Sequence, residues 1–77
     1  MKLLGFSVVA FRDGKTYSSW CPDLDVASQG RSAELAIAHL KEAIELHLES
    51  MSKDEIREIK ARQGSRLLTT IEVPVPA

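Results

Sequence analysis

The chain has 77 residues, with 10 Lys and Arg against 11 Asp and Glu, and a single cysteine. This length allows one domain, residues 1–77, and the lone Cys21 excludes an internal disulfide. The balanced charge argues against a nucleic-acid-binding protein, which at this size usually carries a basic excess. The apolar start is too short for a signal peptide, and no segment approaches the ~20 apolar residues of a membrane span. We therefore expect a cytoplasmic protein whose small core favours oligomerisation or partner binding.

Three strands are predicted in the first half of the chain. Residues 4–11 are rich in β-formers, and residues 15–21 read as a returning strand. Asp13-Gly14 between them predicts a two-residue type I′ hairpin turn, which places Arg12 opposite Lys15 and Phe6 opposite Cys21. Residues 26–29 predict a short third strand, ended by Gly30.

Two helices are predicted next. Ser32 is a good N-cap for a helix over residues 33–50, and Ser52 with Glu55 has the form of a capping box that begins a shorter helix ending near Gly64. In the second helix Ile56 and Ile59 should face inward. The first helix has one apolar stripe, formed by Ala33, Ala36, Ile37, Leu40, Ala43, Ile44 and Leu48.

A last strand is predicted at the end of the chain. In residues 67–75 the odd positions are apolar except for Thr69. They alternate with even positions that include Glu72 and Pro74, which predicts a strand with one apolar face. Pro74 lacks an N–H group, which favours the edge or end of a sheet. The predicted order is β-β-β-α-α-β, an α+β fold in which helices pack on one face of an antiparallel sheet.

The hairpin register predicts an uncovered apolar face. Helices in so short a chain cover only one side of the sheet. If they cover the side with Phe6, Val8 and Cys21, the other side exposes Val9, Phe11 and Trp20. An exposed apolar patch on a small protein usually marks an interface, and Trp is enriched in interface hot spots. The alternative is that Trp20 closes the edge of the core.

Cys21 and the two histidines are weak candidates for catalysis. His39 and His47 lie about two helical turns apart, with ~12 Å of rise between them, too far for one metal ion. We expect His39 to be exposed, His47 to be half-buried, and Cys21 to be a small buried hydrophobe.

Three aspartates and the turn before the first helix could each form a binding site or have a purely structural role. Asp13, Asp23 and Asp25 are carboxylates that a metal-dependent nuclease would need, but Asp13 lies in the hairpin turn and the other two lie in a loop. The segment Gly30-Arg31-Ser32 precedes a helix N-terminus, where an anion can bind, but one glycine is not a phosphate-binding loop, and a strand-to-helix turn with its cap is the favoured explanation. No cofactor is implied.

Two segments, CPDLDVASQG (residues 21–30) and LKEAIELHLES (residues 40–50), together resemble the small HicB-like antitoxin family. The closing IEVPV (residues 71–75) is similar to the last strand of that family, so the resemblance spans about residues 5–75. The matching positions are Cys21, Pro22, Asp23, Leu24, Gln29, Gly30, Ser32, Ala36, Leu40, Lys41, Glu42, Ala43, Ile44, Glu45, Leu46, Leu48 and Glu49.

The resemblance implies a fold and a function. The fold is a β-β-β-α-β core with an RNase-H-like or partial dsRBD-like topology. The function is that of a non-catalytic antitoxin that binds and blocks a HicA-type toxin, a small ribonuclease that cleaves mRNA, and that forms dimers or higher assemblies. The chain departs from the family pattern at Arg31, Leu35 and His47. Many members carry a DNA-binding extension that is not expected here, so autoregulation by DNA binding is not expected either.

Three functions are therefore weighed. The first is the antitoxin-like protein-binding module, with Val9, Phe11, Trp20, Asp23 and Asp25 as the candidate partner or oligomer interface. The second is a nucleic-acid-binding domain that uses the basic residues of the second helix, namely Lys53, Arg57, Lys60 and Arg62. The third is an enzyme whose carboxylates hold a metal ion. We favour the first because an inhibitor needs surface rather than a catalytic set.

Overall fold

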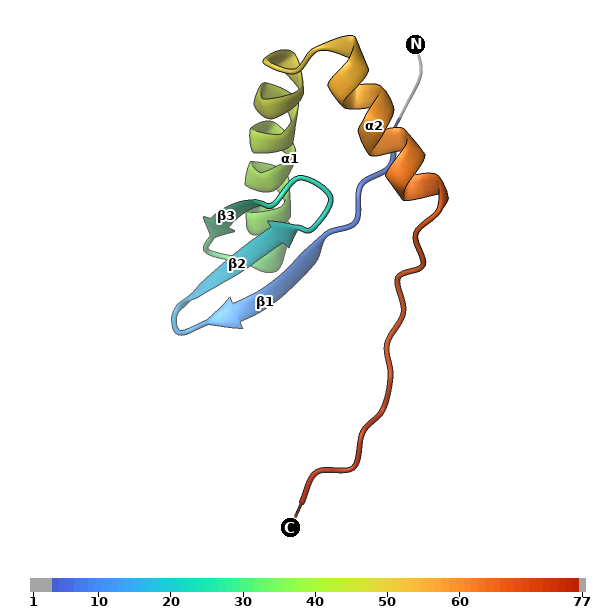
Figure 1. Ribbon diagram of the computed structural model, residues 1–77. Helices are drawn as coiled ribbons and strands as arrows, with labels where there is room; N and C mark the ends of the chain where they lie inside the picture. The colour runs from blue at the N-terminus through green and yellow to red at the C-terminus, as the bar shows by residue number, and fades with distance from the viewer. Residues whose placement is uncertain (1–3, 77) are drawn as a thin grey trace.

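The structure, a computed structural model, describes residues 4–76. It has three strands, β1 (Val9–Asp13), β2 (Thr16–Cys21) and β3 (Val26–Gly30), followed by two helices, α1 (Ala33–Glu49) and α2 (Lys53–Gly64). The strands form one antiparallel sheet in the order β1-β2-β3, and α1 packs across it, mainly over β2 and β3 (Figure 1). The predicted α+β fold with an antiparallel sheet is confirmed, but only α1 packs on a face of the sheet, where both helices were expected.

The hairpin turn differs from the predicted one. Asp13 pairs with Thr16, so the two-residue loop is Gly14-Lys15 rather than Asp13-Gly14. Gly14 has a φ of 66° and Lys15 has a negative φ, a pattern that favours a type II′ turn over type I′. The true register differs from the predicted one by two residues. Because side chains alternate with a period of two, the predicted composition of each face is unchanged.

A close contact joins β3 to α1. The side-chain hydroxyl of Ser32 accepts a hydrogen bond from the Leu35 N–H at 3.1 Å, which caps the helix as predicted. A Cβ on Gly30 would lie 2.5 Å from the backbone nitrogen of Ala36. Only glycine therefore lets the start of α1 come this close to the sheet. Residues 30–32 therefore form a strand-to-helix turn, in which Gly30 permits the close contact and Ser32 caps the helix.

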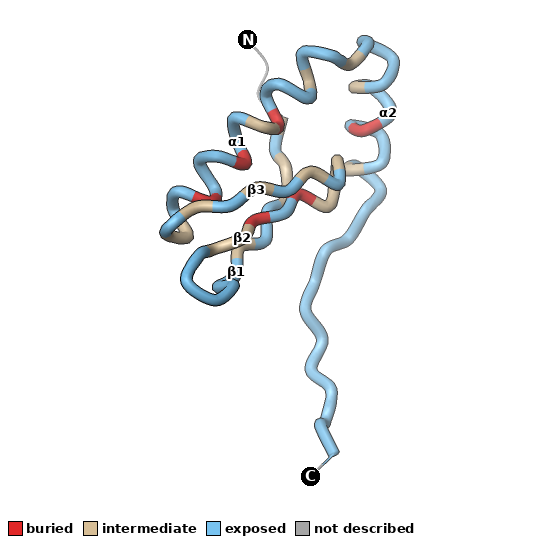
Figure 2. The backbone as a smooth tube through the Cα atoms, turned by 90° about the vertical axis from the view of Figure 1, so that its left-hand side faces the viewer, coloured by how far each residue is buried: buried red, intermediate tan, exposed pale blue. Residues whose placement is uncertain are grey.

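The core is small and lies between α1 and the sheet face beneath it, which we call the inner face. Cys21, Leu40 and Ile44 are buried together, with Phe6 and Val26 among the partly buried residues packed against them (Figure 2). Ser19 is also buried on the inner face, where its hydroxyl donates a 2.7 Å hydrogen bond to the carbonyl of Ala36.

Helix α2 begins at the predicted capping box, in which Ser52 and Glu55 each accept a hydrogen bond from the other's backbone N–H. Ile59 is buried and Ile56 is half-buried. The helix does not lie over a face of the sheet. Instead it lies beside the segment that precedes β1, where the Gln63 side-chain amide donates to the carbonyl of Gly5 at 2.8 Å (Figure 1).

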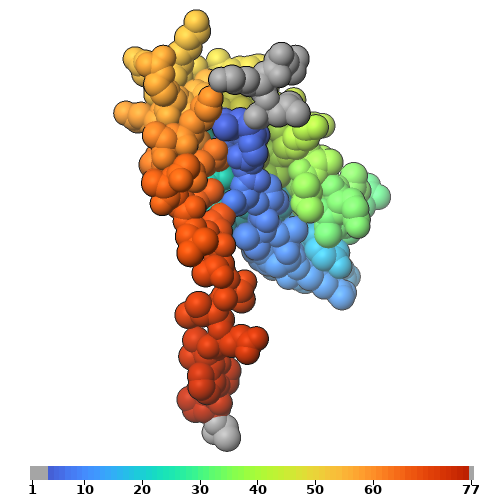
Figure 3. Space-filling model, turned by 90° about the vertical axis from the view of Figure 1, so that its right-hand side faces the viewer, coloured from blue at the N-terminus to red at the C-terminus, as the bar shows by residue number. Residues whose placement is uncertain are grey.

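The predicted last strand is wrong for the isolated chain. Residues 66–76 belong to no strand, are exposed throughout, and run away from the domain as an extended segment (Figures 1 and 3). The alternating pattern suits a strand, but a strand forms only when its backbone pairs with a neighbour, and this segment pairs with neither edge of the sheet in the described structure.

Candidate protein-binding face

The face of the sheet turned away from α1 carries the three apolar residues predicted to be uncovered. Val9 pairs with Trp20 and Phe11 pairs with Ser18, so these side chains share one face, and the pairings of β2 with β3 add Ala27 and Gln29. We call this set the outer face. The exposed fractions are 48% for Val9, 51% for Phe11 and 40% for Trp20. Neither helix lies over these side chains, so Trp20 does not close the core.

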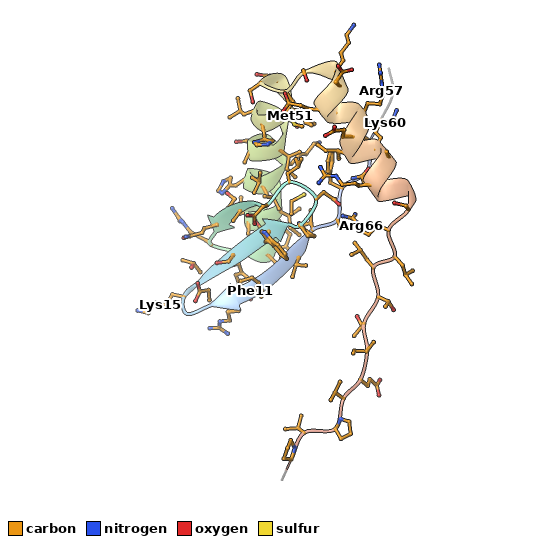
Figure 4. The ribbon with its side chains drawn as sticks, viewed as in Figure 1. Phe11, Lys15, Met51, Arg57, Lys60 and Arg66 are labelled. Atoms are coloured by element: carbon orange, nitrogen blue, oxygen red, sulfur yellow. The ribbon has the colours of Figure 1, made fainter. Side chains whose placement is uncertain are left out.

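The outer face is shallowly concave. Phe11, Ser18, Trp20, Ala27 and Gln29 line a hollow of about 480 Å³. Phe11 lies on the hairpin, at the other end of the domain from Arg57 and Lys60 of α2 (Figure 4). The hollow is open, and two aromatic side chains and small residues form its walls. Such a surface suits an inserted side chain of a protein partner.

Trp20 is held in place by a carboxylate. Its indole Nε1 donates a 2.9 Å hydrogen bond to Oδ1 of Asp25. Asp25 has a φ of 54°, in the left-handed region that Asp adopts more readily than most residues. The turn after β2 thus presents an exposed carboxylate beside the indole, and the predicted neighbours Trp20 and Asp25 are brought together.

Asp23 lies elsewhere and has a structural role. Its side chain is only 1% exposed, and its Oδ2 accepts a 2.8 Å hydrogen bond from the backbone N–H of Ser7. The guanidinium of Arg66 forms an ion pair with its other oxygen. Asp23 therefore joins the turn after β2 to the segment before β1 and to the end of α2. We leave it out of the proposed binding surface.

Cys21 is buried on the inner face, as predicted. Burial raises the pKa of its thiol, although a hydrogen bond with the Leu24 backbone and the charge of Arg66 act in the opposite direction. A buried thiol of raised pKa is a poor nucleophile, because the reactive form is the thiolate. The structure thus gives Cys21 the environment of a packing residue.

The histidines do not approach Cys21. His39 is exposed, as predicted, and its Nδ1 lies 2.6 Å from the carbonyl oxygen of Gln29. His47 is exposed rather than half-buried, because it lies in the last turn of α1, which extends beyond the sheet (Figure 1). Among residues 4–76, no three His, Cys, Asp or Glu side chains lie close enough to hold a metal ion.

Two features of the structure were not predicted from the sequence, one on the outer face and one beside the core. Ala27 and Gln29 belong to the outer face, and the alternation of residues 26–30 was the signal that would have placed them there. The contact of Asp23 with Arg66 had no local signal, because the two residues are far apart in the sequence.

Within residues 4–76, neither helix has the length and apolar character needed to cross a membrane. Comparison of the chain with protein-family models, with curated proteins and with solved structures finds no match.

Proposed function

We propose that this chain is a HicB-like, non-catalytic antitoxin or a relative of one, which binds a HicA-type mRNA-cleaving toxin in the cytoplasm through its outer face and also self-associates. The observation that carries the proposal is the exposure of Val9, Phe11 and Trp20 on a sheet face that neither helix covers. In a chain with so small a core, apolar side chains left in water indicate a surface that a partner covers.

The outer face has the properties of a protein-binding site. Trp20 and Phe11 are aromatic anchors of the kind that dominate binding energy. The hydrogen bond to Asp25 holds the indole in one orientation before binding, which lowers the entropy lost when a partner docks. The face is therefore preorganised where the contact would be made.

Charge supports the same partner class. Asp13 lies on the outer face at the hairpin end, where it accepts a hydrogen bond from Ser18, and Asp25 lies at the other end beside Trp20. A ribonuclease that binds mRNA needs a basic surface, which two flanking carboxylates would attract and orient. Inhibition would follow from covering the RNA-binding surface of the toxin, with no chemistry by this chain.

The test uses the HicA-type toxin encoded nearest to the gene for this chain. Co-expression should restore growth of cells that express the toxin, and the two proteins should elute as one complex in gel filtration. Phe11→Thr should weaken the complex at least tenfold, because it removes an aromatic anchor while keeping a residue that favours strands.

A matched control is Leu46→Ser. Leu46 is an apolar residue of α1 that is 67% exposed and lies away from the outer face. It should leave the complex unchanged. Failure to restore growth together with absence of a complex would count against the proposal, as would equal effects of the two variants.

A second candidate is nucleic-acid binding by α2, which one observation favours. Lys53, Arg57 and Lys60 surround a single exposed hollow on α2, although Arg57 also pairs with Asp54 at 3.5 Å (Figure 4). Arg62 lies on a different side of the helix, beside Pro22. Binding to RNA or DNA that weakens steeply with salt, and that is lost in Lys60→Glu but retained in Phe11→Thr, would favour this function over toxin binding.

A further inference from the structure

The extended segment after α2, residues 67–76, exposes an unusual amount of apolar surface. We call this segment the tail. Four of its odd-numbered side chains are largely exposed to solvent, with exposed fractions of 84% for Leu67, 76% for Ile71, 66% for Val73 and 87% for Val75. The tail projects from the domain without packing on it (Figure 3). A β-rich segment of this kind is a strand that lacks a neighbour.

The domain also has an apolar groove that lacks an occupant. The groove has a volume of about 390 Å³ and lies between α1 and the segment before β1. Lys41 and Glu45 of α1 line it along with six apolar side chains, those of Leu4, Phe6, Val8, Ile37, Ile44 and Leu48. Val8 and Ile37 are each exposed by more than a third of their surface. The groove exists because α1 packs mainly over β2 and β3 and leaves the side of β1 uncovered.

The backbone beside the groove is unpaired as well. β1 is an edge of the sheet. The N–H of Ser7 and the carbonyl of Gly5 point toward Asp23 and α2. Since successive residues of an extended chain point their backbone groups to opposite sides, those of Phe6 and Val8 point toward the free edge. A strand added there would pair with this edge and place alternate side chains over the groove.

We infer that the tail of a second copy of this chain occupies this edge and groove, and that two copies exchange tails about a two-fold axis. Each tail leaves its own domain at Arg66, whose guanidinium is fixed by Asp23 and lies 3.4 Å from the hydroxyl of Ser7. In a reciprocal exchange both tails are paired and both grooves are filled, and the assembly is closed.

The area involved is sufficient for a stable dimer. Burying one aliphatic side chain removes on the order of 100 Å² from water. The four side chains of two tails bury on the order of 800 Å², and the groove walls they cover bury a comparable area, so the total of about 1,600 Å² lies within the range of specific stable interfaces. Dimerisation also offsets the marginal stability of so short a chain.

Pro74 fixes which side of the tail pairs with β1. Because Pro74 has no N–H, the even-numbered residues must point their backbone groups toward solvent. The odd-numbered residues then pair with β1, and their apolar side chains lie on one face of the added strand. The amide protons of Ile71 and Val73 should therefore be protected from hydrogen exchange, and that of Glu72 should not.

The first experiment measures the mass of the full chain in solution by light scattering and sedimentation. The wild type should be a dimer of 8.5 kDa chains. Ile71→Asp combined with Val73→Asp should raise the dimer dissociation constant at least 100-fold with an unchanged circular dichroism spectrum in the helical region, because these side chains contact nothing in their own domain. Thr70→Asp, on the opposite side of the tail, is the matched control and should remain a dimer.

The second experiment distinguishes exchange from the tail folding back on its own edge. In a dimer made from labelled and unlabelled chains, isotope-filtered NMR should detect contacts between methyl groups of Ile71 or Val73 and those of Ile37 or Ile44 in the other chain. A wild-type monomer, a dimer that survives the double substitution, or contacts found only within one chain would each overturn the inference. The inference rests on the self-association named in the proposed function, and its outcome is distinguishable from that of toxin binding, because the outer face is a separate surface and no toxin is needed.

Discussion

Replacing Gly30 with alanine tests whether α1 is held against the inner face by the close contact that leaves the outer face free. The new Cβ would lie 2.5 Å from the nitrogen of Ala36, and ordinary contacts begin at 3.4 Å, so the start of α1 has to move by about 0.9 Å. That movement stretches the 2.7 Å bond from the buried Ser19 hydroxyl to Ala36 beyond hydrogen-bonding distance.

The cost can be estimated from these two effects. Overpacking of this kind costs about 1–3 kcal/mol, and a buried hydroxyl without a partner costs about the same, so a total near 3 kcal/mol is expected. A domain of this size has a free energy of unfolding of roughly 4–12 kcal/mol. The variant should therefore lose a large part of its stability, with a fall in Tm of about 15 °C.

The assay is urea unfolding followed by the fluorescence of Trp20, the single tryptophan. Gly64→Ala is the matched control, because a Cβ there meets nothing within 4 Å at the end of α2. It should be neutral or stabilising by up to about 1 kcal/mol. A loss below 1 kcal/mol for Gly30→Ala, or equal effects of the two substitutions, would refute the close approach of α1 to β3.

Three further predictions concern the turn after β2 and the core beside it. Burial raises the pKa of the Cys21 thiol above its ordinary value of 9.0. The protonated thiol therefore stabilises the folded state fully below pH 9, and this stabilisation is lost as the pH rises through the raised pKa. The free energy of unfolding should fall more steeply above pH 9 in the wild type than in Cys21→Ala. Asp23→Ala leaves Arg66 and a backbone N–H without their acceptor and should cost about 2–3 kcal/mol in urea unfolding; a cost below 1 kcal/mol would contradict the role assigned to this carboxylate. Asp25→Gly keeps the positive φ but removes the indole acceptor, so the fluorescence anisotropy of Trp20 should fall and toxin affinity should drop about fivefold, whereas Asp25→Asn, which retains an acceptor, should change neither.

Much of the local structure could be predicted from the sequence because its causes are local. Ser32 and Ser52 cap the two helices through neighbours three residues away, and the apolar stripe places Leu40 in the core. The composition of the outer face was also predictable, because it depends only on the alternation of a strand. A one-residue error in the position of the turn shifted the register by two residues and therefore left that face unchanged.

The remaining features depend on contacts between distant parts of the chain. The burial of Asp23 required Arg66 to come from the end of α2. His47 is exposed because the last turn of α1 extends beyond the sheet, and a helical stripe alone does not show where the covering sheet ends. The alternating pattern of residues 67–75 shows that this segment can adopt a strand conformation. A strand forms only when its backbone pairs with the edge of a sheet, and in this structure the segment pairs with neither edge of the sheet.

The measurement that tests the outer face most directly is a titration of the isotopically labelled chain with the HicA-type toxin, followed residue by residue by NMR. Binding through this face predicts chemical-shift changes and loss of solvent exposure concentrated at Val9, Phe11, Trp20 and Ala27, with the indole N–H of Trp20 among the largest. Changes concentrated on α2 around Arg57 and Lys60, or no changes at all at saturating toxin, would contradict the account.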